Sequence, residues 1–284
     1  MAIAHLAILA PGLLGASVAR AARERGLADT ITVWARRPEV RDALRNQPWV
    51  DHVADTPESA VARATLVVLA APVDKIIELD RQIAPALTAG AIVTDVGSVK
   101  GPICQAAATV SRPVGAVFIG SHPMAGSAQT GWEHGTASLF EGRVTFVTPS
   151  CDTPPSALAT LEGFWRGLGS TVVTRTAEEH DTIVANISHL PQALATSLAC
   201  ALASKDGGWR ALSGNGLRDT TRIAASDATM WVEIFQHNRP AVLAALASYE
   251  AELARFRNAL ETSDWTSVRA QLATGKTWRD GFPN

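Results

Sequence analysis

Two short segments carry residue types that could do acid–base chemistry. Residues 120–127 read Gly-Ser-His-Pro-Met-Ala-Gly-Ser and contain His122, and residues 95–100 read Asp-Val-Gly-Ser-Val-Lys. An imidazole can accept a proton near neutral pH. Each segment follows an expected strand, and open α/β sheets bind ligands at the carboxyl ends of their strands. We therefore expect both segments at one site; the alternative is a structural histidine in a glycine-rich loop.

A glycine-containing loop lies between an expected strand and an expected helix near the start of the chain. Residues 10–15 read Ala-Pro-Gly-Leu-Leu-Gly, which matches a dinucleotide-binding fingerprint with Ala10 in place of the first glycine. Gly12 would allow a pyrophosphate to approach the backbone, and Gly15 would allow the helix to pack closely on the strand. The helix N-terminus favours the phosphate charge. A tight strand-to-helix turn explains the glycines equally well.

The end of the second expected strand predicts which dinucleotide binds. An NAD site usually places Asp or Glu there, on the ribose 2′-hydroxyl. Residues 34–37 instead read Trp-Ala-Arg-Arg, and two guanidinium groups can pair with a 2′-phosphate. The sequence favours NADP, with NAD as the other possible cofactor and a solvated arginine pair as the alternative interpretation. We assign the cofactor site to Gly12, Leu13, Leu14, Gly15, Arg36, Arg37, Ala71, Pro72 and Ser98.

Alternating strands and helices occupy the first two-thirds of the chain. Short apolar runs are typical of strands buried on both faces, and apolar residues three or four apart are typical of helices. Strands separated by helices predict a Rossmann-type, doubly wound parallel sheet. Strands are expected over residues 5–10, 31–34, 66–70, 91–95, 116–121, 144–147 and 171–173. Helices are expected over 13–25 and 38–46, after the strands at 66–70 and 91–95, and from about 154.

The strand pattern ends near residue 176, where helical spacing takes over. Pro191 lacks an N–H and should kink the first helix of this part, and Asn238 and Pro240 suit the start of another. The chain therefore divides into an α/β dinucleotide-binding domain, 1–175, and an all-helical domain, 176–284. Its helices are expected over residues 177–203, 227–237, 240–260 and 265–272.

The composition excludes several classes of protein. The 284 residues are 47% hydrophobic and 18% charged, which is a globular composition. A net charge of −2 offers no positive field to nucleic acid or anionic lipid. The three cysteines lie far apart, so we expect no disulfide framework and no metal site. No Lys or Arg precedes the first apolar run, and no window has the length of a membrane span. We expect a cytoplasmic protein without nucleic-acid or membrane partners.

The chemistry-bearing segments resemble those of the prephenate/arogenate dehydrogenases, and three more segments extend the resemblance. These read Ser-His-Leu-Pro-Gln at 188–192, Gly-Leu-Arg-Asp-Thr-Thr-Arg-Ile-Ala at 216–224 and Met-Trp at 230–231. All occur in the family's order. The resemblance implies an oxidative decarboxylation in tyrosine biosynthesis. A hydride leaves the ring carbon that bears the hydroxyl and goes to the nicotinamide, the ring carboxylate leaves as carbon dioxide, and the ring becomes aromatic.

The same resemblance implies roles for individual residues. His122 would accept the hydroxyl proton, and Ser98 would lie beside the same hydroxyl and the nicotinamide. His189 would face the substrate side chain, with a helix-face histidine as the alternative. Arg222 would bind a substrate carboxylate, for which a guanidinium is suited. Arg218 is a second candidate for that role, with a surface arginine as the alternative.

Two departures from the family's patterns bear on substrate and cofactor. Many members that use prephenate have a second histidine at the position of Gln192. A neutral amide favours arogenate, whose side chain carries an amino group, and the pair Arg36 and Arg37 resembles members that use NADP with arogenate. Ala10 is expected to weaken cofactor binding without abolishing it.

The resemblance also implies an intertwined homodimer, with the substrate cleft between the domains. The helical domain would then serve both substrate binding and dimerisation. Apolar residues of the last long helix could bury one another across a two-fold axis or within one chain. These residues are Leu243, Leu246, Leu253, Phe256 and Leu260.

Two other functions remain open. A dehydrogenase of β-hydroxy acids or of a related cyclohexadienyl substrate would share the architecture. The β-hydroxy acid enzymes usually centre on a lysine in a helix of the second domain, whereas Lys205 lies beside two glycines in an expected loop. A dinucleotide sensor without turnover would suit the altered loop at Ala10, but a sensor needs neither a proton acceptor nor a carboxylate partner.

Overall fold

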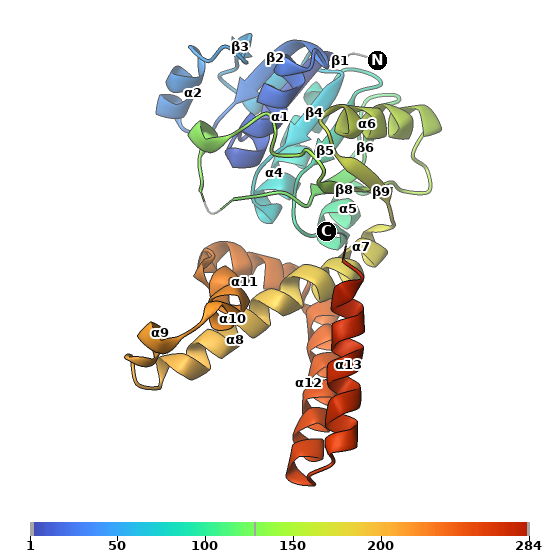
Figure 1. Cartoon of the computed structure of the whole chain (residues 1–284). Helices are drawn as coiled ribbons and strands as arrows, with labels where there is room; N and C mark the ends of the chain where they lie inside the picture. The colour runs from blue at the N-terminus through green and yellow to red at the C-terminus, as the bar shows by residue number, and fades with distance from the viewer. Residues whose placement is uncertain (1–2, 128, 283–284) are drawn as a thin grey trace.

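The structure, a computed structural model, describes residues 3–127 and 129–282, which form an α/β part and a helical part (Figure 1). The α/β part centres on a six-stranded parallel sheet of order β3-β2-β1-β4-β5-β6. The predicted fold class is confirmed. The strands are β1 (Ile3–Leu9), β2 (Ala28–Trp34), β3 (His52–Val53), β4 (Leu66–Leu69), β5 (Ile92–Asp95) and β6 (Val117–Phe118).

Helices pack on both faces of this sheet. They are α1 (Leu13–Glu24), α2 (Pro38–Leu44), α3 (Pro57–Val61), α4 (Val73–Ile83), α5 (Gly101–Ala107) and α6 (Pro155–Gly167). Leu6 and Ile8 of β1 enter the core shared with α1 and α6, whereas Ala7 and Leu9 enter the core shared with α4. Successive side chains of a strand point to opposite faces. The unbroken apolar run of β1 therefore requires helices on both sides.

The strand order reverses between β1 and β4, which are neighbours in the sheet. At such a point the loops that follow the two strands diverge and leave a crevice at the carboxyl edge. The loop after β1 covers residues 10–12, the loop after β4 covers 70–72, and residues 96–100 follow β5. The topology thus collects several of the segments assigned to the cofactor at one edge.

A second sheet of three strands holds His122. β7 (Gly120–Pro123) pairs antiparallel with β8 (Val144–Thr148), and β8 pairs in parallel with β9 (Thr171–Thr174). His122 therefore lies within a buried strand, and the expectation that it lies in a loop after a parallel strand is wrong.

The prediction of a single strand over residues 116–121 is also wrong, because the chain passes from the first sheet to the second within this segment. Ile119 N donates to Val93 O at 2.9 Å, which continues the parallel ladder. Ser121 N instead donates to the carboxylate of Asp95 at 3.1 Å. This side-chain acceptor draws the backbone out of the first sheet, so β6 ends and β7 begins.

Beyond β9 the described chain is helical. Thr176 and Glu179 form a capping box that starts the first helix. The α-helices are α7 (Ala177–Val184), α8 (Leu190–Ala203), α9 (Trp209–Leu212), α10 (Asn215–Thr221), α11 (Ala228–His237), α12 (Arg239–Glu261) and α13 (Trp265–Asp280). Shorter turns are the π-helical η3 (Ala185–His189) and the 3-10 helices η1 (Ala84–Ala86), η2 (Trp132–His134) and η4 (Arg222–Ala225).

Helices α7 and α8 are joined through the π-helical turn η3, where sequence analysis expected a kink near Pro191. A proline offers no N–H and its ring excludes the carbonyl four residues earlier, so the backbone widens just before it. Asn238 occupies the N-cap position of α12, but its side chain makes no capping bond. Its Nδ2 donates instead to Asp181 O at 2.8 Å.

Helices α12 and α13 run side by side and point away from the sheets (Figure 1). α13 has no buried residue, and Leu243, Leu253 and Leu260 of α12 are 53%, 53% and 45% exposed. A single chain therefore leaves an apolar surface on α12 uncovered. None of the described helices combines the length and apolar character needed to cross a membrane.

Candidate active site

The loop after β1 has the backbone of a phosphate-binding turn. Ala10 has a φ of 61°, in the left-handed region that glycine adopts freely. A Cβ on Gly15 would lie 2.9 Å from the Cβ of Ala70, so close packing of α1 on the sheet requires this glycine. A Cβ on Gly12 would meet no protein atom within 4 Å. Gly12 also begins α1 without a side-chain cap, which leaves N–H groups of the first turn for an anion.

A cavity of about 660 Å³ opens beside this loop. Its volume lies within the usual range for small-molecule sites. Gly12 lines it, and the space beside this glycine, which holds no protein atom, fits a dinucleotide phosphate. The assigned cofactor residues that line it are Gly12, Arg36, Arg37, Ala71 and Pro72. Those that do not line it are Leu13, Leu14, Gly15 and Ser98.

The arginine pair stands at the end of β2 on the cavity wall. The side chains of Arg36 and Arg37 are exposed, and Arg37 Nε lies 3.8 Å from Glu39 Oε1. Arg41 Nη1 donates to the carbonyl oxygens of Ala35 at 2.9 Å and Arg36 at 3.1 Å, which fixes the turn that carries the pair. This donor set fits a 2′-phosphate.

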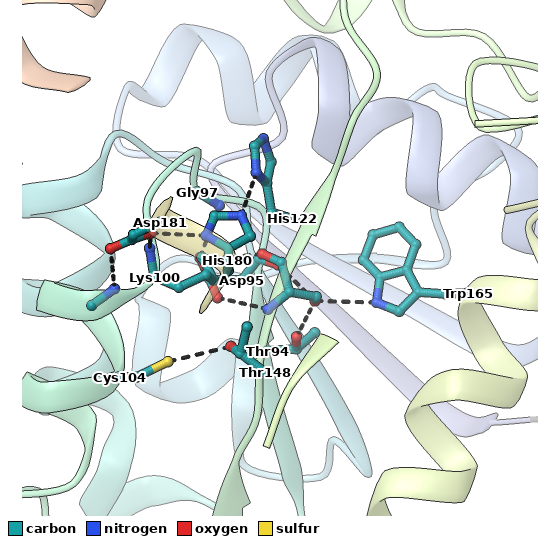
Figure 2. Close-up of polar contacts among 12 residues, drawn as sticks. Thr94, Asp95, Gly97, Lys100, Cys104, His122, Thr148, Trp165, His180 and Asp181 are labelled. Carbon is teal, nitrogen blue, oxygen red and sulfur yellow. Dashed lines mark hydrogen bonds and ion pairs between the residues drawn. The ribbon is translucent and has the colours of Figure 1, made fainter. Parts of the chain in front are cut away.

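Two buried histidines form a hydrogen-bonded chain with a carboxylate (Figure 2). Nδ1 of His122 lies 2.9 Å from Nε2 of His180, and Nδ1 of His180 lies 2.8 Å from Oδ1 of Asp181. A carboxylate can only accept, so His180 donates through Nδ1 and accepts through Nε2. His122 then donates through Nδ1 and keeps a lone pair on Nε2. In this tautomer, Nε2 of His122 is free of a proton.

Asp181 is held in place by the start of α5. Its Oδ1 accepts from Lys100 N at 2.7 Å, and its Oδ2 accepts from Gly101 N at 2.8 Å. Burial would raise the pKa of Asp181, but the hydrogen bonds from His180, Lys100 and Gly101 outweigh burial and hold that pKa below its ordinary value. Asp181 is therefore charged at neutral pH.

A buried ion pair joins the two sheets beside this chain. Lys100 Nζ bonds Asp95 Oδ2, and it also donates to Ser121 O at 2.8 Å. Gly97 N donates to the same carboxylate at 2.8 Å. Breaking such a buried pair by removing one partner typically costs about 3–5 kcal/mol. The pair therefore fixes β7, and with it His122, against the end of β5.

Burial keeps the histidines of this region neutral. Burial, then the nearby His180, Lys100 and His189, hold the pKa of His122 well below its ordinary value. Burial also lowers the pKa of His180, although Asp181 opposes the shift. For His189, burial lowers the pKa to about 4. The neutral imidazole is the form that accepts a proton.

His189 is the last residue of the turn η3 and is buried. Asn238 Nδ2 donates to its Nδ1 at 3.2 Å, and the Trp231 ring packs edge-on against it at a centroid distance of 5.9 Å. These contacts fix the ring of His189 in a buried position.

Gln192 lies one turn further along, at the start of α8, and is buried. Its Nε2 donates to Thr196 Oγ1 at 3.3 Å, whereas its Oε1 is buried without a partner among the described residues. An unsatisfied buried acceptor typically costs about 1–3 kcal/mol. A donor group on a ligand would satisfy this amide oxygen.

The remaining assigned residues lie elsewhere. Ser98 is half-buried in the loop after β5, next to the Gly97 that bonds Asp95. Arg218 on α10 and Arg222 on η4 are exposed, and neither guanidinium bonds a residue in the described part of the chain. Both α10 and η4 pack against α8. The structure thus links His122 to His189 through hydrogen bonds of His180, Asp181 and Asn238, but leaves the two arginines on the surface of the helical part.

His180 and Asp181 were not among the site residues predicted from the sequence. Both stand in the first two turns of α7, where acidic and polar residues are common. The usable signal is their spacing, because His180 lies four residues before the buried Val184 and Asp181 lies four residues before the buried Ala185. Polar residues on the buried stripe of a helix require partners.

One group of the described residues has the spacing of metal ligands: Asp74, Glu233 and His237, whose ligand atoms lie within 4.8 Å of one another. His237 Nε2 lies 2.9 Å from Asp74 Oδ1, and Asp74 N donates to Glu233 Oε1 at 3.1 Å. The positive end of α4 disfavours a cation here. We interpret the group as a contact between α4 and α11, and the absence of a metal stays a prediction.

Comparisons with known proteins agree over nearly the whole chain. The family model described as "Prephenate dehydrogenase, nucleotide-binding domain" matches residues 18–174, and "Prephenate dehydrogenase, dimerization domain" matches residues 176–274. The cyclohexadienyl dehydrogenase of Zymomonas mobilis is 33% identical over 264 residues, which are 92% of this chain and 89% of that protein.

Two solved structures extend the comparison to the fold. The arogenate dehydrogenase of Synechocystis superposes with a TM-score of 0.86 at 28% identity, over 97% of this chain and 99% of that one. The prephenate dehydrogenase of A. aeolicus, in complex with hydroxyphenyl propionate and NAD+, superposes with a TM-score of 0.90 at 27% identity, over 98% of each chain.

Proposed function

The chain belongs to the prephenate dehydrogenase family of oxidoreductases, and from this premise we propose that it catalyses the oxidative decarboxylation of prephenate or arogenate in tyrosine biosynthesis. Of these two substrates we favour arogenate, and of the two cofactors NADP.

The chain of His122, His180 and Asp181 is the observation that carries this proposal. When the hydroxyl-bearing ring carbon loses its hydride, it gains carbonyl character and the hydroxyl proton needs an acceptor. His122 Nε2 supplies the acceptor, and Asp181 stabilises, through His180, the positive charge that develops. The bond to the ring carboxylate breaks and carbon dioxide leaves. The electron pair of that bond moves through the ring to the oxygen, which takes the proton back from His122 as the ring becomes aromatic.

The cofactor site follows from the cavity beside α1. A bound nicotinamide dinucleotide would supply the hydride acceptor of the reaction. Gly12 and the start of α1 suit its pyrophosphate, and Arg36 and Arg37 suit a 2′-phosphate. Ser98, next to the buried network of Asp95, would orient the substrate hydroxyl.

Gln192 supports arogenate as the substrate. Its buried Oε1 lacks a donor, and the ammonium group of arogenate would provide one. His189 would face the same substrate side chain. Arg222, with Arg218 as the second candidate, would bind a carboxylate, which requires that the cleft close over these exposed guanidinium groups.

A homodimer through the C-terminal helices is part of the proposal. Leu243 and Leu253 expose apolar surface on α12. The matched family model is described as a dimerization domain and covers these residues. A second copy of the chain would bury this surface.

The test is an initial-rate assay of the purified protein with prephenate or arogenate, each with NAD or NADP, that follows the reduced nicotinamide. Turnover of arogenate with NADP at the highest kcat/KM is the expected result. Higher kcat/KM with prephenate or with NAD would overturn the corresponding preference. Absence of turnover in all four assays, with dinucleotide binding intact, would favour another dehydrogenase substrate or the sensor.

A variant tests the role of Gln192 separately. Gln192→His should shift the ratio of kcat/KM values toward prephenate, because a neutral imidazole can offer an N–H donor to the keto acid side chain in place of the amide oxygen, which only accepts. Ser197→His, on the exposed side of α8, is the matched control and should leave the ratio unchanged. An unaltered ratio in Gln192→His would remove this residue from substrate selection.

A further inference from the structure

One wall of the cofactor cavity comes from outside the dinucleotide fingerprint. Trp132 of η2 lines the cavity that Gly12, Arg36 and Arg37 also line. We propose that the indole of Trp132 packs against the adenosine end of the dinucleotide and is part of the cofactor-binding site. This inference rests on the proposed function, since it takes the ligand of the cavity to be a dinucleotide.

The segment that carries Trp132 is built onto α1. A Cβ on Gly135 would lie 2.8 Å from the Cβ of Ala16 and 3.0 Å from Ser17 N, so only glycine allows this contact. Thr136 N donates to Ser17 Oγ at 3.0 Å. The helix α1, whose N-cap residue Gly12 lines the cavity, thus also anchors the segment that bears the indole.

The backbone conformation just before Trp132 also favours a glycine. Gly131 has a φ of 102°, a conformation that side chains rarely allow, and it lines the cavity itself. The Trp132 side chain is half-buried and, like Leu14 and Val40, packs against the apolar core that α1 and α6 share with the sheet. One part of the indole is therefore fixed by the protein while another part faces the cavity.

The other lining residues identify the end of the ligand that Trp132 meets. Arg36 and Arg37 suit a 2′-phosphate and Gly12 suits the pyrophosphate, whereas His122 and Ser98 do not line this cavity. The cavity therefore takes the adenosine half. An indole offers a flat face for stacking, and stacking of a base on an aromatic side chain is a substantial contribution to binding.

Trp34 also lines the cavity, but its role differs. Its Nε1 donates to Asp55 O at 3.3 Å, and its ring packs against the core on the α4 side of the sheet. Trp34 thus has protein contacts on its polar and apolar parts. Trp132 is the aromatic residue that the structure leaves for the ligand.

The experiment measures binding to the full-length protein without turnover. Isothermal titration gives Kd values for NADPH and for two adenosine fragments, 2′,5′-ADP and ADP. Trp132→Leu keeps apolar bulk but loses the aromatic face, and it should raise Kd for each bound fragment about tenfold. Trp132→Phe should restore most of the affinity. Trp265→Leu, at a site 63% exposed on α13, is the control and should bind like the unaltered protein.

A fluorescence readout checks the same contact. Quenching of tryptophan fluorescence by 2′,5′-ADP at saturation should be smaller in Trp132→Leu than in the unaltered protein and should stay unchanged in Trp265→Leu. Wild-type affinity of Trp132→Leu for the adenosine fragments would overturn the inference, as would an equal loss in Trp132→Phe. Failure of the unaltered protein to bind NADPH, NADH and both fragments would overturn the proposed function and this inference together.

Discussion

Nδ1 of His122 and Nε2 of His180 lie 2.9 Å apart, although 58 residues separate the two histidines in the chain. His122 belongs to β7 of the α/β part, and His180 belongs to α7 of the helical part. The hydrogen-bonded chain of His122, His180 and Asp181 is therefore complete only when the two parts of the chain are docked. The hydrogen bonds from Lys100 N and Gly101 N to Asp181 stabilise the same contact.

The first prediction concerns this pair. His122→Asn should lower kcat by about 10²–10⁴-fold, the usual contribution of a general base, while Kd for NADPH stays unchanged. His180→Asn should lower kcat less, because His122 remains but loses the partner that fixes its tautomer and orientation. His134→Asn alters an exposed histidine and is the control for steady-state kinetics. A normal kcat in His122→Asn would exclude His122 as the proton acceptor.

The second prediction concerns the backbone of Ala10. At a φ of 61°, strain destabilises a residue with a Cβ by roughly 1–2 kcal/mol, and glycine avoids this strain. Glycine also has more conformational entropy in the unfolded chain, which lowers the free energy of unfolding by about 0.4–1 kcal/mol. Ala10→Gly should therefore raise the free energy of unfolding by up to about 1 kcal/mol, measured by urea denaturation. Ala159→Gly, at an exposed helical site in α6, should lower it by about 1 kcal/mol. Equal destabilisation by both substitutions would contradict this account.

Gly12 and Gly15 should respond oppositely to the same substitution. Gly15→Ala places a methyl group 2.9 Å from the Cβ of Ala70 and should destabilise the fold by about 1–3 kcal/mol. Gly12→Ala meets no protein atom within 4 Å, so the melting temperature should hold while Kd for NADPH rises. Thermal unfolding and titration of each variant separate the two effects. Normal NADPH binding by Gly12→Ala would argue against a phosphate at this turn.

A fourth prediction follows from the low pKa of His189, about 4 against an ordinary value of 6.5. Below pH 6.5 the unfolded chain takes up a proton at this residue and the folded chain does not, so stability present above 6.5 is lost as pH falls toward 4. The decrease in the free energy of unfolding that comes from His189 is at most about 3 kcal/mol. His122 and His180, whose pKa values burial also lowers, act in the same direction.

Urea denaturation at pH 7 and at pH 5, at one fixed protein concentration, measures this loss. His189→Gln should show a smaller decrease between the two pH values than the unaltered protein. His134→Gln, at an exposed site, should show the full decrease. Identical pH dependence in the His189→Gln and unaltered proteins would refute the assignment.

The last prediction tests the apolar surface of α12. Leu253 is 53% exposed, so Leu253→Arg should leave the protomer folded but place a charge in the proposed dimer interface. Light scattering should show the mass of one chain in place of two at micromolar concentration. Val114→Arg, at a site 90% exposed in the α/β part, is the control. A dimer that persists in Leu253→Arg would move the interface elsewhere.

Sequence by itself determined much of the nucleotide-binding half. The apolar runs that became β1, β2, β4 and β5 and the loop with Gly12 and Gly15 follow from residues only a few positions apart. The pair Arg36 and Arg37 after the end of β2 can be read from neighbouring residues in the same way. Such features can be read from sequence because strand and helix periods and turn conformations depend on near neighbours.

Only the tertiary structure decided how the surroundings of His122 are assembled. His122 lies in β7 and not in the expected loop, His180 and Asp181 form a hydrogen-bonded chain with it, and Trp132 lines the cavity beside Gly12. The helical period marks His180 as buried, but it does not say what the buried side will meet. That partner is selected by the packing of sheets and helices across many residues, since hydrogen bonds and close contacts form wherever the folded surfaces fit.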